Sequence, residues 1–159
     1  MATDFRRLIE TLATASVDFV VLGGLAVVAH GHVRATLDLD VCYTRTPDNL
    51  ARLARALAPL HPVLRGAPAD LPFILDARTL RSGLNFTLRT EAGDIDLLGE
   101  VTGVGQYEEA ARGAIPMELF CRRILVVSLD VLERSKRAVG RAKDLLDLEA
   151  IRELRRRGG

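Results

Sequence analysis

The 159-residue chain has few of the features that mark membrane and secreted proteins. It contains no run near the roughly 20 apolar residues that cross a bilayer as a helix. Its N-terminus, MATDFRRLIETL, carries acidic residues and no signal-peptide hydrophobic region. These absences predict a cytoplasmic protein with no membrane partner.

Cysteine is also scarce. Cys42 and Cys121 both lie in apolar segments, and neither belongs to a spacing typical of metal ligands. We therefore expect two reduced thiols in the core rather than a disulfide or a zinc site.

Lysine is nearly absent as well, although the chain has 22 basic residues. Lys136 and Lys143 are the two lysines, and both lie within SKRAVGRAKD. A lysine ammonium binds phosphate as a compact point charge, whereas an arginine guanidinium is a planar fork. The pattern favours a phosphate-binding role for these lysines, with chance clustering as the alternative.

The net charge of +1 conceals an uneven distribution. Residues 1–120 hold 11 Arg and 15 acidic residues, whereas residues 121–159 hold 11 Lys or Arg and 6 acidic residues. The C-terminal RELRRRGG could contact a polyanion such as RNA, and a solvated helix face is the plainer alternative. The acidic part of the chain contains the candidate site.

The length and the 48% hydrophobic content suit one domain with a core. Segments of period two and of period 3.6 predict an α/β (α+β) fold, in which helices flank a mixed β-sheet. We expect a single domain over residues 1–159, with a C-terminal helical segment at about 128–157.

Caps, turns and hydrophobic alternation place the individual elements. In the N-terminal half they predict a helix capped by Thr3, a strand over 18–22, a turn at Gly23-Gly24, a short helix ending at Gly31, a strand over 33–43, a helix opened by Thr46 and a loop over 59–75. In the C-terminal half they predict a helical turn over 77–82, a hairpin of 85–90 and 94–101, a loop running into a short helix over 101–114, one or two strands within 115–129, a helix capped by Ser128, a break at Gly140 and a last helix that buries Leu145, Leu148, Ile151 and Leu154.

Two acids interrupt the predicted strand over 33–43. Asp38 and Asp40 alternate with apolar residues, so both carboxylates lie on one face. Like charges on one face repel, and burying a carboxylate without a partner is costly, so a purely structural origin requires compensating cations. Mg²⁺ prefers a few carboxylates together with phosphate oxygens, and Asp96 on a later strand would complete a two-metal site. The alternative is an exposed strand that carries acids without a metal.

The two glycines before this strand suit the same chemistry. A strand that runs into Gly23, Gly24 and a helix lets the backbone approach a triphosphate closely and directs free N–H groups toward it. Both glycines are therefore candidate phosphate ligands.

The combination of strand, Gly-Gly, short helix, D-x-D and a later acid resembles the nucleotidyltransferase fold superfamily of DNA polymerase β. The matching residues are Gly23, Gly24, Asp38, Asp40 and Asp96. The string RATLDLD is most similar to bacterial minimal nucleotidyltransferases and to the abortive-infection type toxins of toxin–antitoxin modules. Those proteins also carry a later lysine and a helix with the pattern R-x-K-D-x-x-D, which is matched here by Arg141, Lys143, Asp144 and Asp147.

The resemblance implies a Mg²⁺-dependent enzyme, with Mn²⁺ as a substitute, that moves a nucleoside monophosphate from an NTP to an acceptor. The implied acceptor is RNA or tRNA, or a protein hydroxyl, and a toxin of this kind would have a cognate antitoxin as partner. The metal would be held by Asp38, Asp40 and Asp96. Catalysis would involve these acids and Lys136, and nucleotide contacts would come from Gly23, Gly24, Arg34, Thr36 and Lys143.

Two further functions stay open. One is a small-molecule nucleotidyltransferase of the aminoglycoside-modifying kind, and the other is a non-catalytic binding or antitoxin-like module with the same fold. The intact set of Asp38, Asp40 and Asp96 favours an enzyme, because a degenerate module is expected to lose one of the three.

Other polar residues lie near the motifs. Asp94 begins its strand near a turn, so we expect it to be peripheral. Asp144 and Asp147 lie about one helical turn apart, and a structural and a functional role are equally compatible with that spacing. His30 and His32 flank Gly31, where two polar rings at a helix end are a simpler explanation than a metal site.

Overall fold

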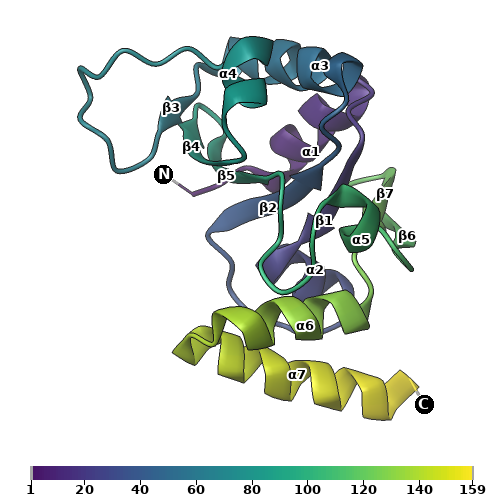
Figure 1. The fold of residues 1–159 in the computed structure, drawn as a ribbon. Helices are drawn as coiled ribbons and strands as arrows, with labels where there is room; N and C mark the ends of the chain where they lie inside the picture. The colour runs from purple at the N-terminus through teal and green to yellow at the C-terminus, as the bar shows by residue number, and fades with distance from the viewer. Residues whose placement is uncertain (1, 159) are drawn as a thin grey trace.

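Strands β1 to β7 form one mixed sheet in the computed structural model, which describes residues 2–158 (Figure 1). The sheet order is β3-β4-β5-β2-β1-β7-β6. The strands are β1 (Phe19–Leu22), β2 (Asp38–Tyr43), β3 (Val63–Leu64), β4 (Asn85–Thr90), β5 (Gly93–Leu98), β6 (Ile115–Leu119) and β7 (Arg122–Val126). The helices are α1 (Phe5–Thr14), α2 (Gly23–Ala29), α3 (Pro47–Leu57), α4 (Ala77–Ser82), α5 (Tyr107–Ala110), α6 (Leu129–Val139) and α7 (Ala142–Gly158). The predicted α/β class is confirmed.

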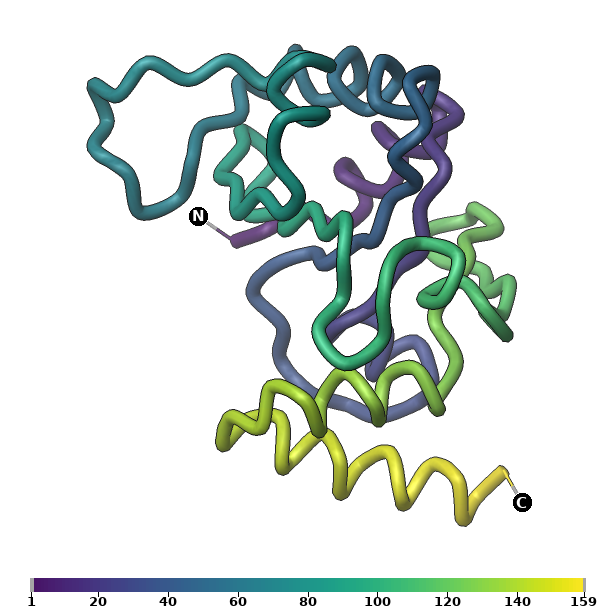
Figure 2. The backbone as a smooth tube through the Cα atoms, viewed as in Figure 1, coloured from purple at the N-terminus to yellow at the C-terminus, as the bar shows by residue number. Residues whose placement is uncertain are grey.

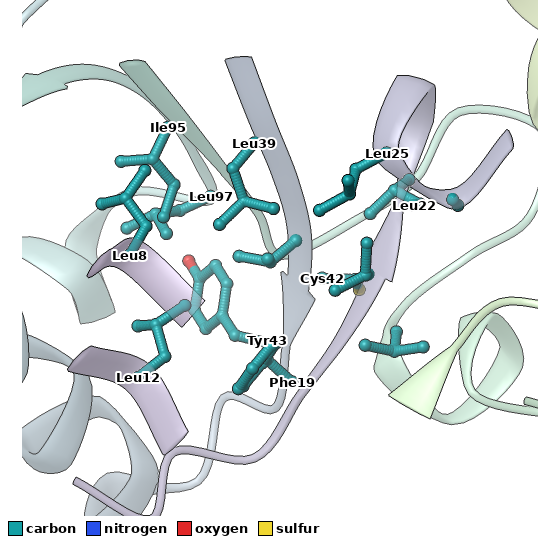
Figure 3. Close-up of a cluster of buried hydrophobic side chains, with 14 of the residues drawn as sticks. Leu8, Leu12, Phe19, Leu22, Leu25, Leu39, Cys42, Tyr43, Ile95 and Leu97 are labelled. Carbon is teal, nitrogen blue, oxygen red and sulfur yellow. The ribbon is translucent and has the colours of Figure 1, made fainter. Parts of the chain in front are cut away.

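One face of the sheet is apolar and packs on α1. Figure 3 shows Leu8 and Leu12 of this helix beside buried side chains of β2 and β5, among them Leu39, Tyr43, Ile95 and Leu97. Side chains alternate between the two faces of a strand. The acids that alternate with these apolar residues therefore lie on the opposite face.

Strand β2 is shorter than the predicted strand over 33–43. Its neighbours β1 and β5 pair with it at Leu22 opposite Asp40 and at Asp94 opposite Asp38. β1 extends no further in this direction, because the chain turns into α2 directly after Leu22, and β5 begins one residue before Asp94, at Gly93. The residues that precede Asp38 have no strand beside them and form an irregular connection.

Helix caps follow the sequence at Thr46 and Ser128, whose side chains accept hydrogen bonds from the first turns of α3 and α6. At α1 the prediction is wrong by one residue, since Asp4 is the cap. Thr3 has another role, because its hydroxyl donates a hydrogen bond to the carbonyl of Leu37 at 2.6 Å. This bond ties the segment before α1 to the connection before β2.

The proline-rich segment over 59–75 was predicted to be entirely loop, and this prediction is wrong in part. It contains the short edge strand β3, which pairs with β4 through Val63 and Leu64. Two residues are too few for alternation to be visible in a sequence. The strand matters because it places the next residue, Arg65, beside the sheet.

Helices α6 and α7 pack on each other and contact α2, at one end of the molecule (Figures 1 and 2). Gly140, with φ +66°, ends α6 in the left-handed conformation, at the predicted break. The predicted buried stripe of α7 is wrong at Leu145, which is 56% exposed, whereas Asp144 and Asp147 are buried. No helix within residues 2–158 combines the length and the apolar character needed to cross a membrane.

The two cysteines lie in different environments. Cys42 is buried in β2, and this burial raises the pKa of its thiol to about 12. Cys121 is exposed, contrary to the prediction of a core thiol. Together with Phe120 it forms the tight turn between β6 and β7, where both residues have positive φ, as two-residue hairpin turns require.

Candidate metal and nucleotide site

Three carboxylates converge on the face of the sheet opposite α1. Parallel pairing of β2 with β5 sets Asp40 beside Asp96, and Asp38 precedes Asp40 by two residues on the same face. One oxygen from each of the three side chains lies within 4.8 Å of the other two. We call Asp38, Asp40 and Asp96 the acidic cluster.

Burial and repulsion within the acidic cluster both act on Asp40. Burial, together with the negative charges of Asp38 and Asp96, raises the pKa of Asp40 from 3.8 to about 8. The positive charge of Lys136 acts in the opposite direction, but its effect on the pKa of Asp40 is smaller. Unless a further cation binds, Asp40 therefore holds a proton at neutral pH.

Arg65, which the sequence analysis did not single out, lies against the acidic cluster. Its guanidinium is 3.6 Å from an Asp38 oxygen and 3.3 Å from an Asp94 oxygen, and it donates a hydrogen bond to Asp96. Burial lowers the pKa of Arg65, but Asp96, Asp94 and Asp38 together raise it by more. The sequence indicated only that the acids need a compensating cation. It could not identify Arg65 as that cation, because several arginines could have met the need.

Gly23 and Gly24 start α2 next to other predicted site residues. Gly23 has φ +69°, and a Cβ at this position would overlap the carboxylate of Asp40, so the position requires glycine. A Cβ at Gly24 would lie 2.6 Å from the hydroxyl oxygen of Thr36 and 3.1 Å from Nη1 of Arg34. The structure thus places Gly23 at the acidic cluster, and Gly24 at the connection before β2.

Lys136 takes part in a group of buried ion pairs. Its ammonium is 2.8 Å from an Asp147 oxygen and 3.4 Å from an Asp144 oxygen. Asp147 also accepts a hydrogen bond from Arg34 at 2.9 Å, and Asp144 accepts one from Arg141 at 2.8 Å. We call these five residues the buried network, although only Lys136 and the two acids are buried, Arg34 being half-buried and Arg141 exposed. Its contacts favour a structural role for Asp144 and Asp147, because each acid holds two cations in place.

A cavity of about 240 Å³ lies beside the acidic cluster, and its walls include Gly23, Asp40, Asp96, Lys136 and Arg141. These walls combine carboxylates, which bind cations, with an ammonium and a guanidinium, which bind phosphate. The cavity therefore contains groups that suit the metal ion and groups that suit the phosphates of a metal–triphosphate complex.

Lys143 and the two histidines lie away from this cavity. Lys143 is exposed on α7 and borders a separate hollow with His32 and Arg34. His30 makes a hydrogen bond of 2.8 Å between Nε2 and the carbonyl of Val127, which fits the expected role at a helix end. Lys143 is not among the residues that line the cavity beside the acidic cluster, so its contact with a nucleotide stays a prediction.

The acidic cluster fits a divalent cation of the Mg²⁺ type. Its donors are carboxylate oxygens, the hard ligands that Mg²⁺ and Mn²⁺ prefer. Within residues 2–158 no histidine or cysteine belongs to a group of potential metal ligands, so the donor set gives no indication of zinc.

Comparisons with protein families and with curated proteins were both negative. No protein-family model matches the chain, and no curated protein matches it.

Gly23→Ala is expected to destabilise the protein more than Gly113→Ala, in which the same change is made at φ +72° with the nearest atom 3.8 Å from the added Cβ. Both variants should lose about 1–2 kcal/mol from left-handed backbone strain. Gly23→Ala should lose about 1–3 kcal/mol more because the methyl group collides with Asp40. Urea unfolding measures both losses, and equal losses would contradict the close packing of Gly23 on Asp40.

The raised pKa of Asp40 predicts how stability depends on pH. Between about pH 4 and pH 8 the folded, metal-free protein binds a proton at Asp40 that the unfolded chain has released. The free energy of unfolding therefore falls as the pH rises through this window. Asp40→Asn stays neutral and lacks this dependence, so it should become more stable than the wild type toward pH 8.5. Urea unfolding in EDTA from pH 5 to 8.5 measures the difference, and parallel profiles would rule out the raised pKa.

Lys136→Met should destabilise the protein by about 3 kcal/mol, because it leaves two buried carboxylates with one cation fewer. We expect the lower end of the usual range, since Arg34 and Arg141 still pair with these acids. Lys143→Met makes the same change at an exposed position and should cost less than about 0.5 kcal/mol. Chemical unfolding of both variants tests this, and similar losses would show that the buried network contributes little.

Proposed function

We propose that this protein is a metal-dependent nucleotidyltransferase, which transfers a nucleoside monophosphate from an NTP to a hydroxyl acceptor. The observation that carries the proposal is the acidic cluster, in which carboxylates of two adjacent strands share one cavity with Gly23 and Lys136. The motif resemblance described above supports the same reaction. The acids repel one another, which helps to raise the pKa of Asp40, and a bound divalent cation would relieve this repulsion.

In this proposal Asp38 and Asp40 hold Mg²⁺, with Mn²⁺ as a substitute, and Asp96 joins them. The bound ion would neutralise charge on the triphosphate and on the departing pyrophosphate. Asp96 also orients the acceptor hydroxyl and accepts its proton. The lack of a side chain at Gly23 leaves room for the Asp40 carboxylate, and both residues line the cavity in which the triphosphate would bind.

Lys136 contributes positive charge to the cavity wall on the side of the C-terminal helices. Its two bonds to Asp144 and Asp147 fix the ammonium in position, so that little reorganisation is needed when charge develops on the pyrophosphate. Arg34 and Thr36 support this arrangement from the connection before β2. Arg34 does so through Asp147.

The acceptor we propose is an RNA end, such as that of tRNA, or a protein hydroxyl, as for the toxin of a toxin–antitoxin pair. The basic C-terminus offers limited support for RNA, because its arginines are already paired. Arg155 pairs with Asp130 and Glu133 of α6, and the two arginines that follow it pair with Glu153. The acceptor therefore has to be identified by the reaction itself.

Nucleotide binding in the presence of Mg²⁺ tests the proposal. Isothermal titration calorimetry should detect NTP binding to the wild type and its loss in Asp38→Ala and Asp40→Ala. Asp70→Ala, which removes an exposed carboxylate from the loop before α4, is the matched control and should bind NTP like the wild type. Removing one of three repelling acids should not destabilise the fold, so a loss of binding would not reflect unfolding.

Transfer is then followed with radiolabelled NTPs offered with total tRNA, with a protein mixture or with an aminoglycoside. Label on tRNA or protein would support the proposed acceptors, and label on the aminoglycoside would favour a small-molecule enzyme. Binding without transfer to any acceptor would favour the non-catalytic module. Unchanged binding in both aspartate variants would contradict the metal site.

A further inference from the structure

Arg65 has an anchored backbone, and its guanidinium contacts three acids. Its N–H donates a hydrogen bond of 2.9 Å to the carbonyl of Thr87, which continues the pairing of β3 with β4. Gly66 follows with φ +84° and begins the loop that leads to α4. The position of the guanidinium can therefore change by side-chain rotation alone, without movement of the sheet.

The guanidinium contacts acids of two kinds. Asp38 and Asp96 belong to the acidic cluster, whereas Asp94 lies outside it. Asp94 is next to Asp38 in the register of β2 and β5, so all three carboxylates are on the same face. An arginine has five N–H donors in a planar fork, which allows it to bridge several carboxylates at once.

We propose that Arg65 is the resident counterion of the acidic cluster and that a divalent cation must displace it from Asp38 and Asp96. This inference rests on the proposed function. A metal ion and a guanidinium compete for the same carboxylate oxygens, and their positive charges repel each other when both lie beside these oxygens. Arg65 is thus an intramolecular competitor that lowers the affinity for the metal and keeps the acids together before the metal arrives.

Asp94 provides the partner that Arg65 keeps after displacement. It already lies 3.3 Å from the guanidinium, and it takes no part in the acidic cluster. Arg65 can therefore leave Asp38 and Asp96 without becoming an unpaired, half-buried charge. This gives Asp94 a role in metal exchange, although it does not touch the metal.

Mn²⁺ titrations followed by calorimetry, on the full chain at constant pH and without nucleotide, test the competition. Arg65→Gln should bind Mn²⁺ at least roughly tenfold more tightly than the wild type, because one charge-assisted competitor is lost. Arg89→Gln is the matched control. Arg89 also contacts Asp94, at 3.3 Å, but it does not contact the acidic cluster, so its loss should change the affinity less than about threefold.

The role of Asp94 is tested by a double-mutant cycle. Asp94→Asn should weaken Mn²⁺ binding in the wild-type background, because Arg65 then lacks the carboxylate partner that it keeps when the metal displaces it. In the Arg65→Gln background the same change should have a much smaller effect. An equal effect in both backgrounds would show that Asp94 acts through its charge alone, which would overturn its role as the retained partner.

Thermal unfolding gives a second readout. Metal-free Arg65→Gln should melt at a lower temperature than the wild type, and Mn²⁺ should raise its melting temperature by more. If the glutamine variant does not fold, Arg65→Lys replaces it, since a single ammonium bridges fewer carboxylates and should also tighten binding. Equal or weaker Mn²⁺ affinity in the folded variant would overturn the role of Arg65 alone. No Mn²⁺ binding by any variant would overturn the metal site and the proposed function with it.

Discussion

Repulsion among three carboxylates on one face of the sheet governs the arrangement of the surrounding charges. The register that sets Asp40 beside Asp96 comes from pairing of two strands that are buried on their other face, so the acids cannot move apart without disturbing the core. Positive charge must therefore be brought to them. It comes from Arg65 at the edge of the sheet and from Lys136 on a helix near the other end of the chain.

The C-terminal helices are joined to the rest of the molecule partly by ion pairs in place of apolar contacts. Asp147 binds both Arg34, from the connection before β2, and Lys136, from α6. Buried acids on the inner face of α7 leave leucines on its outer face, where Leu145 and Leu146 are exposed. Buried ion pairs of this kind contribute more to fixing one arrangement than to stability, which suits a lysine whose position at a cavity wall matters.

Sequence patterns predicted the parts of the fold and of the candidate site that depend on local order. Period-two alternation put Asp38 and Asp40 on one face, and the capping residues of α3 and α6 marked their first turns. Arg65 could not be predicted, because it reaches the acids only through a two-residue edge strand. The predicted buried face of α7 was wrong at Leu145. Hydrophobic periodicity assumes that leucines are buried, whereas in the folded protein cations distant in the sequence pair with Asp147 and favour its burial.

The order of the charged residues along the chain has a consequence for synthesis on the ribosome. The acids of the cluster and Arg65 are made first. Lys136, Asp144 and Asp147 follow only after β7 is complete. A nascent chain that ends after β7 contains the acidic cluster and Arg65, whereas the cavity wall that includes Lys136, Arg141 and Asp144 has not yet been made. Translation therefore adds this wall of the cavity last.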